Sequence, residues 1–314
     1  MNKEYIDTQG KAPSHIGGQA VIEGVMMRGK NVYTLAVKNQ AGEIETEINQ
    51  INQDNYKKNM LKIPILRGVV SFIDSLIIGI KIISKSATMA GLDDSKPSKF
   101  EEFLTKKFGD KLNNIIMAIT VVISILLSVG LFMVLPVFIG SIFNKIEFIQ
   151  NNSWLLSVLE GFIRLFIFLM YIVIISKNKD IQRTFGYHGA EHKTINCHEH
   201  EEELTVENVK KYSRLHRRCG TSFLLFVMAI SMLFFMFIKT NTFITRIFSR
   251  VLFVPLIAGI SYEVLRFAGT SNSKIIQIIS APGINLQKIT TKEPDDLQIA
   301  CAIKAMQEVI NHEK

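Results

Sequence analysis

The pattern of apolar and charged positions between residues 112 and 268 is that of a polytopic membrane protein. Residues 112–144 contain no Asp, Glu, Lys or Arg, and this stretch exceeds the roughly 20 residues that a helix needs to cross a bilayer. Three further apolar segments follow at 154–176, 221–238 and 247–268. We therefore predict a mostly α-helical fold with about four transmembrane helices.

Three charged residues interrupt these segments. Glu160 and Arg164 stand four positions apart, so in a helix they can neutralise each other on one face. We interpret them as a structural pair rather than a transport relay. Glu263 requires a partner within the protein, because an isolated carboxylate is costly in hydrocarbon.

Basic residues predict the orientation of the chain. The segment 177–218 contains nine Lys or Arg, whereas the connections 143–153 and 239–245 contain one each. Because Lys and Arg concentrate in cytosolic loops, we place segment 177–218 in the cytosol. With four crossings, both termini are cytosolic as well, in a multi-pass protein of the cell membrane.

The N-terminal part divides into two segments of different pattern. Residues 1–62 form a β-rich cytosolic cap, since 33–48 contains two alternating runs around a Gln-Ala-Gly turn, as in a hairpin. Residues 63–92 form an amphipathic helix at the membrane or against the bundle, because Arg67, Asp74 and Lys81 recur every seven residues on one seam. Partial membrane insertion of this helix is the alternative.

Two further segments lie outside the spans. Residues 93–111 form a charged linker. Residues 269–314 form a cytosolic tail with an Ala-Pro-Gly turn at 281–283, followed by a helix that starts after Pro294.

Composition narrows the class of partner. The formal net charge is +8 and 48% of the residues are hydrophobic. The basic residues flank apolar runs and form no stripe with interleaved aromatics, so we expect the lipid bilayer as partner and no nucleic acid. The cysteines Cys197, Cys219 and Cys301 lack paired spacing, which predicts a reducing compartment and no disulfide framework.

The strongest chemical signal is the run Tyr187-His188-Gly-Ala-Glu191-His192. Two histidines four positions apart share a helix face and can bind one metal ion, while the glutamate between them can act as a general base on a bound water. The order H-x-x-E-H matches the inverted zincin pattern. Alone, such a short motif also arises by chance in a solvated loop.

Such a site needs further ligands. Glu263 is one candidate, because it lies near the cytosolic end of the fourth predicted span. His216 and Cys219, just before the third span, can supply an imidazole and a thiolate at the same membrane face. Thr205 suits the N-cap of a helix at 206–217 that would carry His216. Zinc is the default divalent metal for this ligand set, with iron or manganese as alternatives.

The glycine-rich run 15–28 carries three isolated polar residues. In a single strand, Gln19 and Glu23 fall on one face and Arg28 on the other. Its glycines allow close approach of the backbone to a ligand, although turns and bulges are the simpler role. A cap that folds over the membrane face would bring Glu23, Arg28 and Arg67 to the site, so we include them as candidates together with Tyr187.

Several motifs are spread over nearly the whole chain: GGQAVIEGVMMR at 17–28, PILRG at 64–68, YHGAEHKTINC at 187–197, the stretch 216–221, and the APG and TTKEPDD elements within 281–296. Together they resemble the YqhQ-type family of bacterial membrane proteins. The resemblance implies an inner-membrane protein of a functionally uncharacterised family, described at most as a metal-dependent enzyme. The family pattern has a proline after the histidine of the second cluster, where this chain has Arg217.

The leading hypothesis is a membrane-embedded, metal-dependent, hydrolase-like enzyme with its site at the cytosolic interface. Its substrate would be a membrane-protein segment or a lipid-linked molecule. Two alternatives stay open: a non-enzymatic scaffold or assembly factor whose polar cluster is structural, and a small transporter that uses Glu160 and Arg164. The sequence makes no prediction of the oligomeric state.

Overall fold

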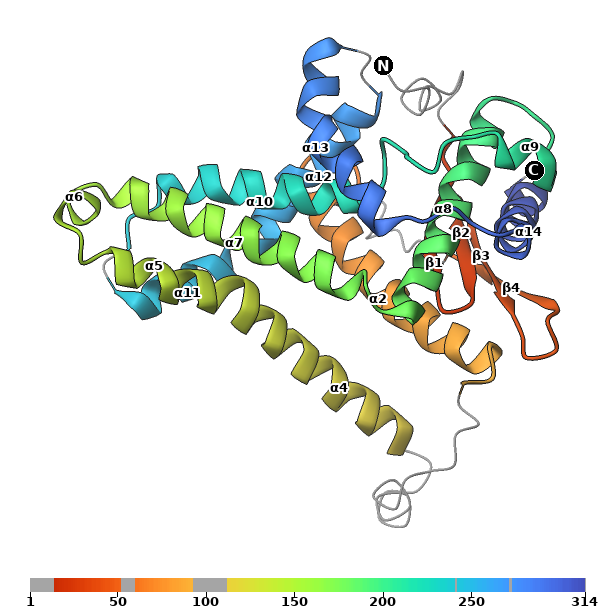
Figure 1. Cartoon of the computed structure of the whole chain (residues 1–314), viewed down its shortest axis with the longest axis horizontal. Coiled ribbons are helices and arrows are strands. Elements are labelled where there is room, and N and C mark those ends of the chain that lie inside the picture. The colour runs from red at the N-terminus through yellow and green to blue at the C-terminus, as the bar shows by residue number, and fades with distance from the viewer. Residues whose placement is uncertain (1–13, 52–59, 93–111, 241, 271–272, 314) are drawn as a thin grey trace. The chain divides into compact units, whose positions relative to one another are not determined.

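The protein is mostly helical, with one small antiparallel sheet near the N-terminus (Figure 1). The structure is a computed structural model that describes residues 14–51, 60–92, 112–240, 242–270 and 273–313; the predicted linker 93–111 lies outside these ranges. The strands are β1 (Gly17–Val21), β2 (Gly24–Arg28), β3 (Val32–Lys38) and β4 (Ile44–Gln50). The helices are α2 (Leu66–Met89), α4 (Leu112–Val129), the π-helical turn η4 (Gly130–Val134), α5 (Leu135–Phe143), α6 (Glu147–Gln150), α7 (Ser153–Ile175), α8 (Lys179–Glu199), α9 (Val206–Lys210), α10 (Gly220–Met236), α11 (Phe243–Leu252), α12 (Val254–Thr270), α13 (Lys274–Thr290) and α14 (Asp296–Glu313).

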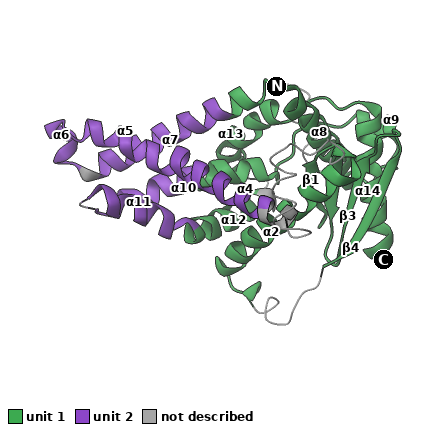
Figure 2. Ribbon diagram, turned by 90° about the horizontal axis from the view of Figure 1, so that it is seen from below, with its two compact units in different colours: residues 1–92, 172–227, 255–314 green, residues 93–171, 228–254 purple. Residues whose placement is uncertain are grey.

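The chain divides into two compact units (Figure 2). Unit 1 contains residues 1–92, 172–227 and 255–314, and unit 2 contains residues 93–171 and 228–254. All the strands belong to unit 1, together with α2, α8, α9, α13 and α14.

The sheet of unit 1 has the order β1-β2-β3-β4 and carries helices on both faces. On one face, Met26 and Tyr33 pack with Ile82 of α2. On the other face, Val25 and Met27 belong to a second apolar core that α8, α9 and α14 complete. Successive strand residues point to opposite faces, so the alternating pattern creates two separate cores.

Two hairpins build this sheet. The hairpin predicted at 33–48 is confirmed as β3 and β4. The prediction that Gln19 and Arg28 lie on opposite faces is wrong, because a tight turn through Glu23, with φ of 53°, divides the run into β1 and β2. Gln19 lies opposite Met26, and Arg28 lies opposite Gly17. Since opposed residues of an antiparallel pair point to the same side, Gln19 and Arg28 share the face toward α2.

Helix α2 confirms the predicted helix within 63–92. Gly79, Ile82 and Ser86 are buried on its sheet side. The opposite side presents an exposed apolar stripe that includes Ile73 and Ile77. This division is the expected pattern of an amphipathic helix that covers a sheet with one face.

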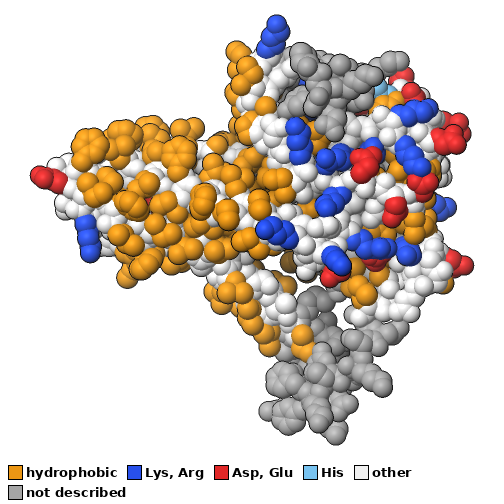
Figure 3. All heavy atoms as spheres, viewed as in Figure 1, with side chains coloured by type: hydrophobic (Ala, Val, Ile, Leu, Met, Phe, Trp, Pro, Cys, Tyr) orange, Lys and Arg blue, Asp and Glu red, His pale blue; other side chains and the backbone are white. Residues whose placement is uncertain are grey.

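Long apolar helices with exposed side chains characterise unit 2. Two helical segments, Ala118–Phe143 and Trp154–Ile175, are long and apolar enough to cross a membrane, and α11 with α12 would make a third if the pair is one broken span. The apolar helix α10 is shorter, with 17 residues. Figure 3 shows hydrophobic side chains over the visible face of unit 2, whereas charged side chains gather over unit 1. The described residues thus contain two or three candidate spans, compared with about four in the sequence prediction.

A buried ionic network replaces the predicted pair of Glu160 with Arg164. The Glu160 carboxylate accepts hydrogen bonds from Arg246 (3.0 Å) and Arg250 (2.7 Å) of α11. Arg164 instead donates to the carbonyl of Phe132 in η4 at 2.8 Å. Both side chains therefore find partners on neighbouring helices, and the expected pairing along α7 is not the arrangement that forms.

The C-terminal tail confirms one prediction and corrects another. The helix expected after Pro294 is α14, which packs against β2, β3 and α8. The turn expected at 281–283 is wrong, because α13 continues through Pro282. Gly283 is buried against Ser222, so close packing supports the helix on the C-terminal side of the proline.

Candidate metal centre

Helix α8 carries the H-x-x-E-H motif on a buried face. Its N-terminus is capped by Asn178, whose side chain accepts hydrogen bonds from the backbone of Asp180 and Ile181. The spacing of four places His188 and His192 on adjacent turns, with ring centroids 4.4 Å apart. The predicted juxtaposition of the two histidines therefore holds.

Cys219 completes a cluster with the two histidines. Its Sγ lies 3.2 Å from His188 Nε2, and the ligand atoms of His188, His192 and Cys219 all lie within 4.8 Å of one another. A tetrahedral zinc ion with bonds of about 2.0 Å to nitrogen and about 2.3 Å to sulfur holds these two atoms about 3.5 Å apart. The spacing of the three side chains therefore fits one small metal ion.

Backbone carbonyls fix the orientation of both rings. His188 Nδ1 lies 2.8 Å from the carbonyl of Thr290, and His192 Nδ1 lies 2.6 Å from that of Arg214. A carbonyl only accepts hydrogen bonds, so each Nδ1 carries a proton and each Nε2 is directed to the cluster. Gly189 permits this arrangement, because a Cβ there would collide with the backbone of Lys292.

The surroundings of Cys219 favour the thiolate form of its side chain. Cys219 precedes α10, and the backbone N–H of Thr221 lies 3.5 Å from its Sγ. Burial disfavours the thiolate, but His192 and His188 outweigh it and hold the pKa of Cys219 well below its usual value. Burial likewise opposes protonation of His188, but Cys219 outweighs it and raises the pKa of that imidazole to about 9. Without a metal, thiolate and imidazolium stabilise each other.

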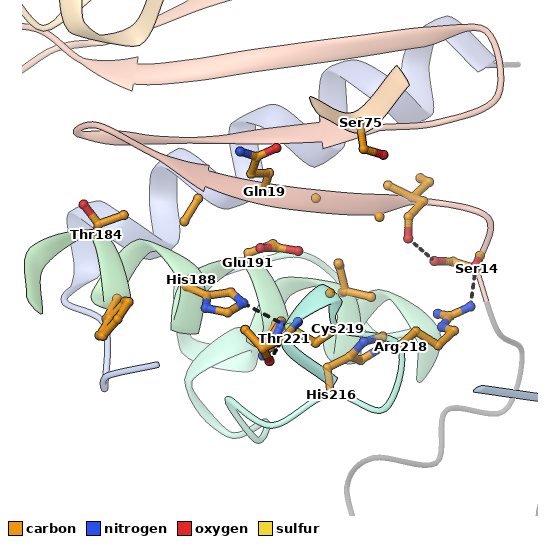
Figure 4. Close-up of a pocket in the computed structure, with 18 of the residues that line it drawn as sticks. Ser14, Gln19, Ser75, Thr184, His188, Glu191, His216, Arg218, Cys219 and Thr221 are labelled. Carbon is orange, nitrogen blue, oxygen red and sulfur yellow. Dashed lines mark hydrogen bonds between the residues drawn. The ribbon is translucent and has the colours of Figure 1, made fainter. Parts of the chain in front are cut away.

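A cavity of about 640 Å³ in unit 1 opens onto this cluster. Glu191 lines it and lies between His188 and β1 (Figure 4). Burial raises the pKa of the Glu191 carboxyl. Strand β1 approaches this side chain closely, since a Cβ on Gly18 would lie 2.7 Å from Glu191 Cγ. Gly18 therefore allows β1 to approach the Glu191 side chain closely, whereas the approach to a ligand considered for this run stays a prediction.

His216 lies beside the cluster without joining its three convergent ligand atoms. Its ring centroid is 5.7 Å from that of His192, and its Nε2 is 3.6 Å from Glu199. Burial lowers its pKa to about 4. Thr205 caps a helix as predicted, but α9 ends at Lys210 rather than at 217. The His216 backbone N–H bonds to the side chain of Gln287 instead of continuing the helix.

The remaining sequence candidates occupy different places. Glu263 forms an ion pair with Arg67 and accepts a hydrogen bond from the backbone of Ile65, so the structure gives it a structural partner and does not bring it to the histidines. Glu23 pairs with Arg183 of α8 and joins the β1–β2 turn to that helix. Tyr187 is fully buried in the core, and its hydroxyl donates to Glu23. Arg28 lines a smaller cavity of about 300 Å³.

Sequence reasoning missed the polar residues that support the site. Arg218 lines the main cavity, forms an ion pair with the buried Glu199 and donates to the backbone of Ser14. Gln287 binds both the N–H and the carbonyl of His216. Arg218 could have been found from the sequence, because it directly precedes Cys219. Gln287 could not, because it is 71 residues from His216 and no motif connects the two.

Comparison with known proteins confirms the resemblance seen in the sequence. The chain belongs to the family described as Protein of unknown function (DUF1385), whose model matches residues 63–312. It is 37% identical over 305 residues to the uncharacterized protein YqhQ of Bacillus subtilis (strain 168), with 96% of this chain and 94% of that protein covered. No solved structure matches the chain significantly.

Proposed function

We propose that this member of the DUF1385 family is a membrane-embedded, metal-dependent, hydrolase-like enzyme. The observation that carries the proposal is the convergence of His188, His192 and Cys219 at the wall of a cavity that Glu191 also lines. Of the ligands expected from the sequence, this set retains the two histidines and the cysteine. Zinc is the metal that two imidazoles and a thiolate suit best.

The ligand count supports a catalytic role. Structural zinc sites are closed by four protein ligands, whereas catalytic sites have three and leave one position for water or substrate. Among the described residues, the cluster has three members and faces a cavity. A metal held there acts as a Lewis acid and makes a nearby water more acidic.

Glu191 is the proposed general base. It stands one position before His192 on the buried face of α8 and lines the same cavity, yet it is outside the set of convergent ligand atoms. Burial raises the pKa of this carboxyl, which makes its carboxylate a stronger base than an ordinary glutamate. Glu191 would accept a proton from water and return it to the leaving group.

The proposal includes the position of the enzyme in the membrane. We propose that α10 and the broken pair α11–α12 cross the bilayer in addition to the two longer candidate spans, which gives four crossings. The nine Lys or Arg in 177–218 favour a cytosolic site, with both termini in the cytosol. A site at that interface would accept a membrane-protein segment or a lipid-linked substrate.

The test is metal content, measured by mass spectrometry on the detergent-purified protein. We expect about one metal ion per chain in the wild type and none in a His188→Ala/His192→Ala variant. A His198→Ala/His312→Ala variant is the matched control, since it removes two histidines outside the cluster and should retain the metal. Absence of metal from wild type and control alike would reject the enzyme proposal, provided that all three proteins elute as monodisperse peaks.

A structural role is the second candidate, and one observation favours it. The Nδ1 atoms of His188 and His192 bind carbonyls of two distant segments, so the histidines also hold α8 against the rest of unit 1. A scaffold predicts that the double variant unfolds or loses a partner, with no metal lost. Thermal unfolding measured beside metal content separates the two functions.

A further inference from the structure

The smaller cavity that Arg28 lines adjoins the candidate metal centre. It shares five lining residues with the larger cavity, namely His15, Gly17, Gly18, Gln19 and Ser75. In Figure 4, Gln19 and Ser75 lie on the other side of β1 from Glu191 and His188. The space beside the metal centre therefore continues past the edge strand β1 to the face of the sheet that α2 covers.

Strand register directs the Arg28 side chain into this space. Arg28 lies directly opposite Gly17, so their side-chain positions share one face of the sheet. No atom lies within 4 Å of the point where a Cβ on Gly17 would be. The glycine thus leaves open space at its own side-chain position, on the face of the sheet that also carries Arg28.

Among the described residues, the lining of the smaller cavity contains one arginine, Arg28, and no carboxylate. Arg28 and Arg218 are the arginines that line the two cavities, and Glu191 is the carboxylate. Arg218 is already paired with Glu199, whereas no carboxylate among the described residues forms an ion pair with Arg28.

Polar side chains line the smaller cavity together with Arg28. Gln19 contributes an amide, Ser75 of α2 a hydroxyl and His15 an imidazole. Within the described part of the chain, none of these three side chains is engaged in a hydrogen bond to another group. An arginine accompanied by free polar donors is the chemistry that recognises the oxygens of a phosphate group.

We propose that this cavity is a subsite for a phosphate group of the substrate, with Arg28 as its charged partner. The assignment of this group to a substrate rests on the proposed function, because the reacting bond would then lie at the metal centre. A lipid headgroup and a soluble phosphate ester offer the same chemistry. Helix α2 provides Ser75 and Ile78 to the wall of the cavity, and its opposite side carries the exposed apolar stripe.

Equilibrium dialysis of the purified full-length protein against radiolabelled inorganic phosphate tests the subsite. We expect about one phosphate per chain, and at least a tenfold loss of affinity in Arg28→Gln, because a charge-assisted bond is removed. Lys81→Gln, which removes an exposed cation from α2, is the control and should bind as the wild type does. Equal binding by wild type and Arg28→Gln would overturn the proposal.

The phosphate subsite and the metal centre can be tested independently of each other. The His188→Ala/His192→Ala variant should still bind phosphate. If this variant lost phosphate binding while Arg28→Gln bound normally, the phosphate would be bound by the metal, and the subsite proposal would be rejected. Arg28→Gln should retain its metal. In nanodiscs, displacement of inorganic phosphate by added phosphatidylglycerol would identify a lipid headgroup as the source, and undiminished binding would identify a soluble ester.

Discussion

The pairing of Cys219 with two histidines predicts that metal removal exposes one reactive thiol among three. The perturbation is treatment of the purified protein with a chelator, which should leave Cys219 as a thiolate beside a protonated His188. All three cysteines are free and buried, but of the three only Cys219 lines the main cavity. A small alkylating reagent should therefore distinguish them.

The expected selectivity follows from ionisation. Burial raises the pKa of Cys197 to about 11 and that of Cys301 to about 12. At pH 7 their thiolate fractions are about 10⁻⁴ and about 10⁻⁵, whereas the lowered pKa of Cys219 gives that residue a much larger thiolate fraction. A less basic thiolate is also a weaker nucleophile, which offsets part of this advantage. We still expect Cys219 to react faster than the other two cysteines, and its access through the cavity should increase the difference.

The assay is timed alkylation with iodoacetamide, followed by peptide mass spectrometry. Zinc added back after the chelator should suppress labelling of Cys219 and leave Cys197 and Cys301 unchanged. Because the pKa of Cys219 is lowered, its labelling rate should fall less steeply with decreasing pH than that of an ordinary thiol, which loses about tenfold per pH unit. Labelling of Cys219 that is no faster than that of the other two, or that zinc does not slow, would refute the reasoning.

Two further predictions concern packing. Glu160→Gln should lower the free energy of unfolding by about 3–5 kcal/mol, because it leaves buried arginines without their counter-ion, whereas the exposed Glu147→Gln in the same unit should change the melting temperature little. Gly18→Ala should destabilise the protein by about 1–3 kcal/mol, because the new Cβ would lie 2.7 Å from Glu191 Cγ and 2.8 Å from the Met26 carbonyl oxygen. Gly17→Ala is the control, because its Cβ meets open space. Retention of metal by Gly18→Ala would agree with Glu191 as a base, and loss of metal would contradict that assignment.

Local patterns predicted local structure well. The alternating run at 33–48 became a hairpin, and the spacing of His188 and His192 became one helix face, because both depend on interactions between residues close in sequence. Cys219 was also expected near the motif. Because Cys219 directly precedes an apolar segment, it had to lie at the end of a predicted membrane helix. From the sequence, that end was expected at the same membrane face as the histidine motif.

Long-range partners were harder to predict. Glu263 needed a partner, and the sequence offered no rule for choosing Arg67, 196 residues away, over the histidines. Glu160 and Arg164 show the same limit, because spacing shows which side chains can meet on a helix and says nothing of competitors on other helices. The faces of Gln19 and Arg28 were misjudged for a third reason: one turn at Glu23 changes the face of every later residue.

The choice between enzyme and scaffold depends on what the cluster borders. In a scaffold, the polar side chains would be satisfied by one another, as Glu160 is by Arg246 and Arg250 in unit 2. The Glu191 side chain instead borders a cavity large enough for a ligand, and β1 approaches it through a glycine. Burial of a carboxyl at a cavity wall costs stability, and the two histidines and the backbone of Gly18 offset part of that cost. A role for Glu191 in accepting a proton accounts for its position, so we favour the enzyme.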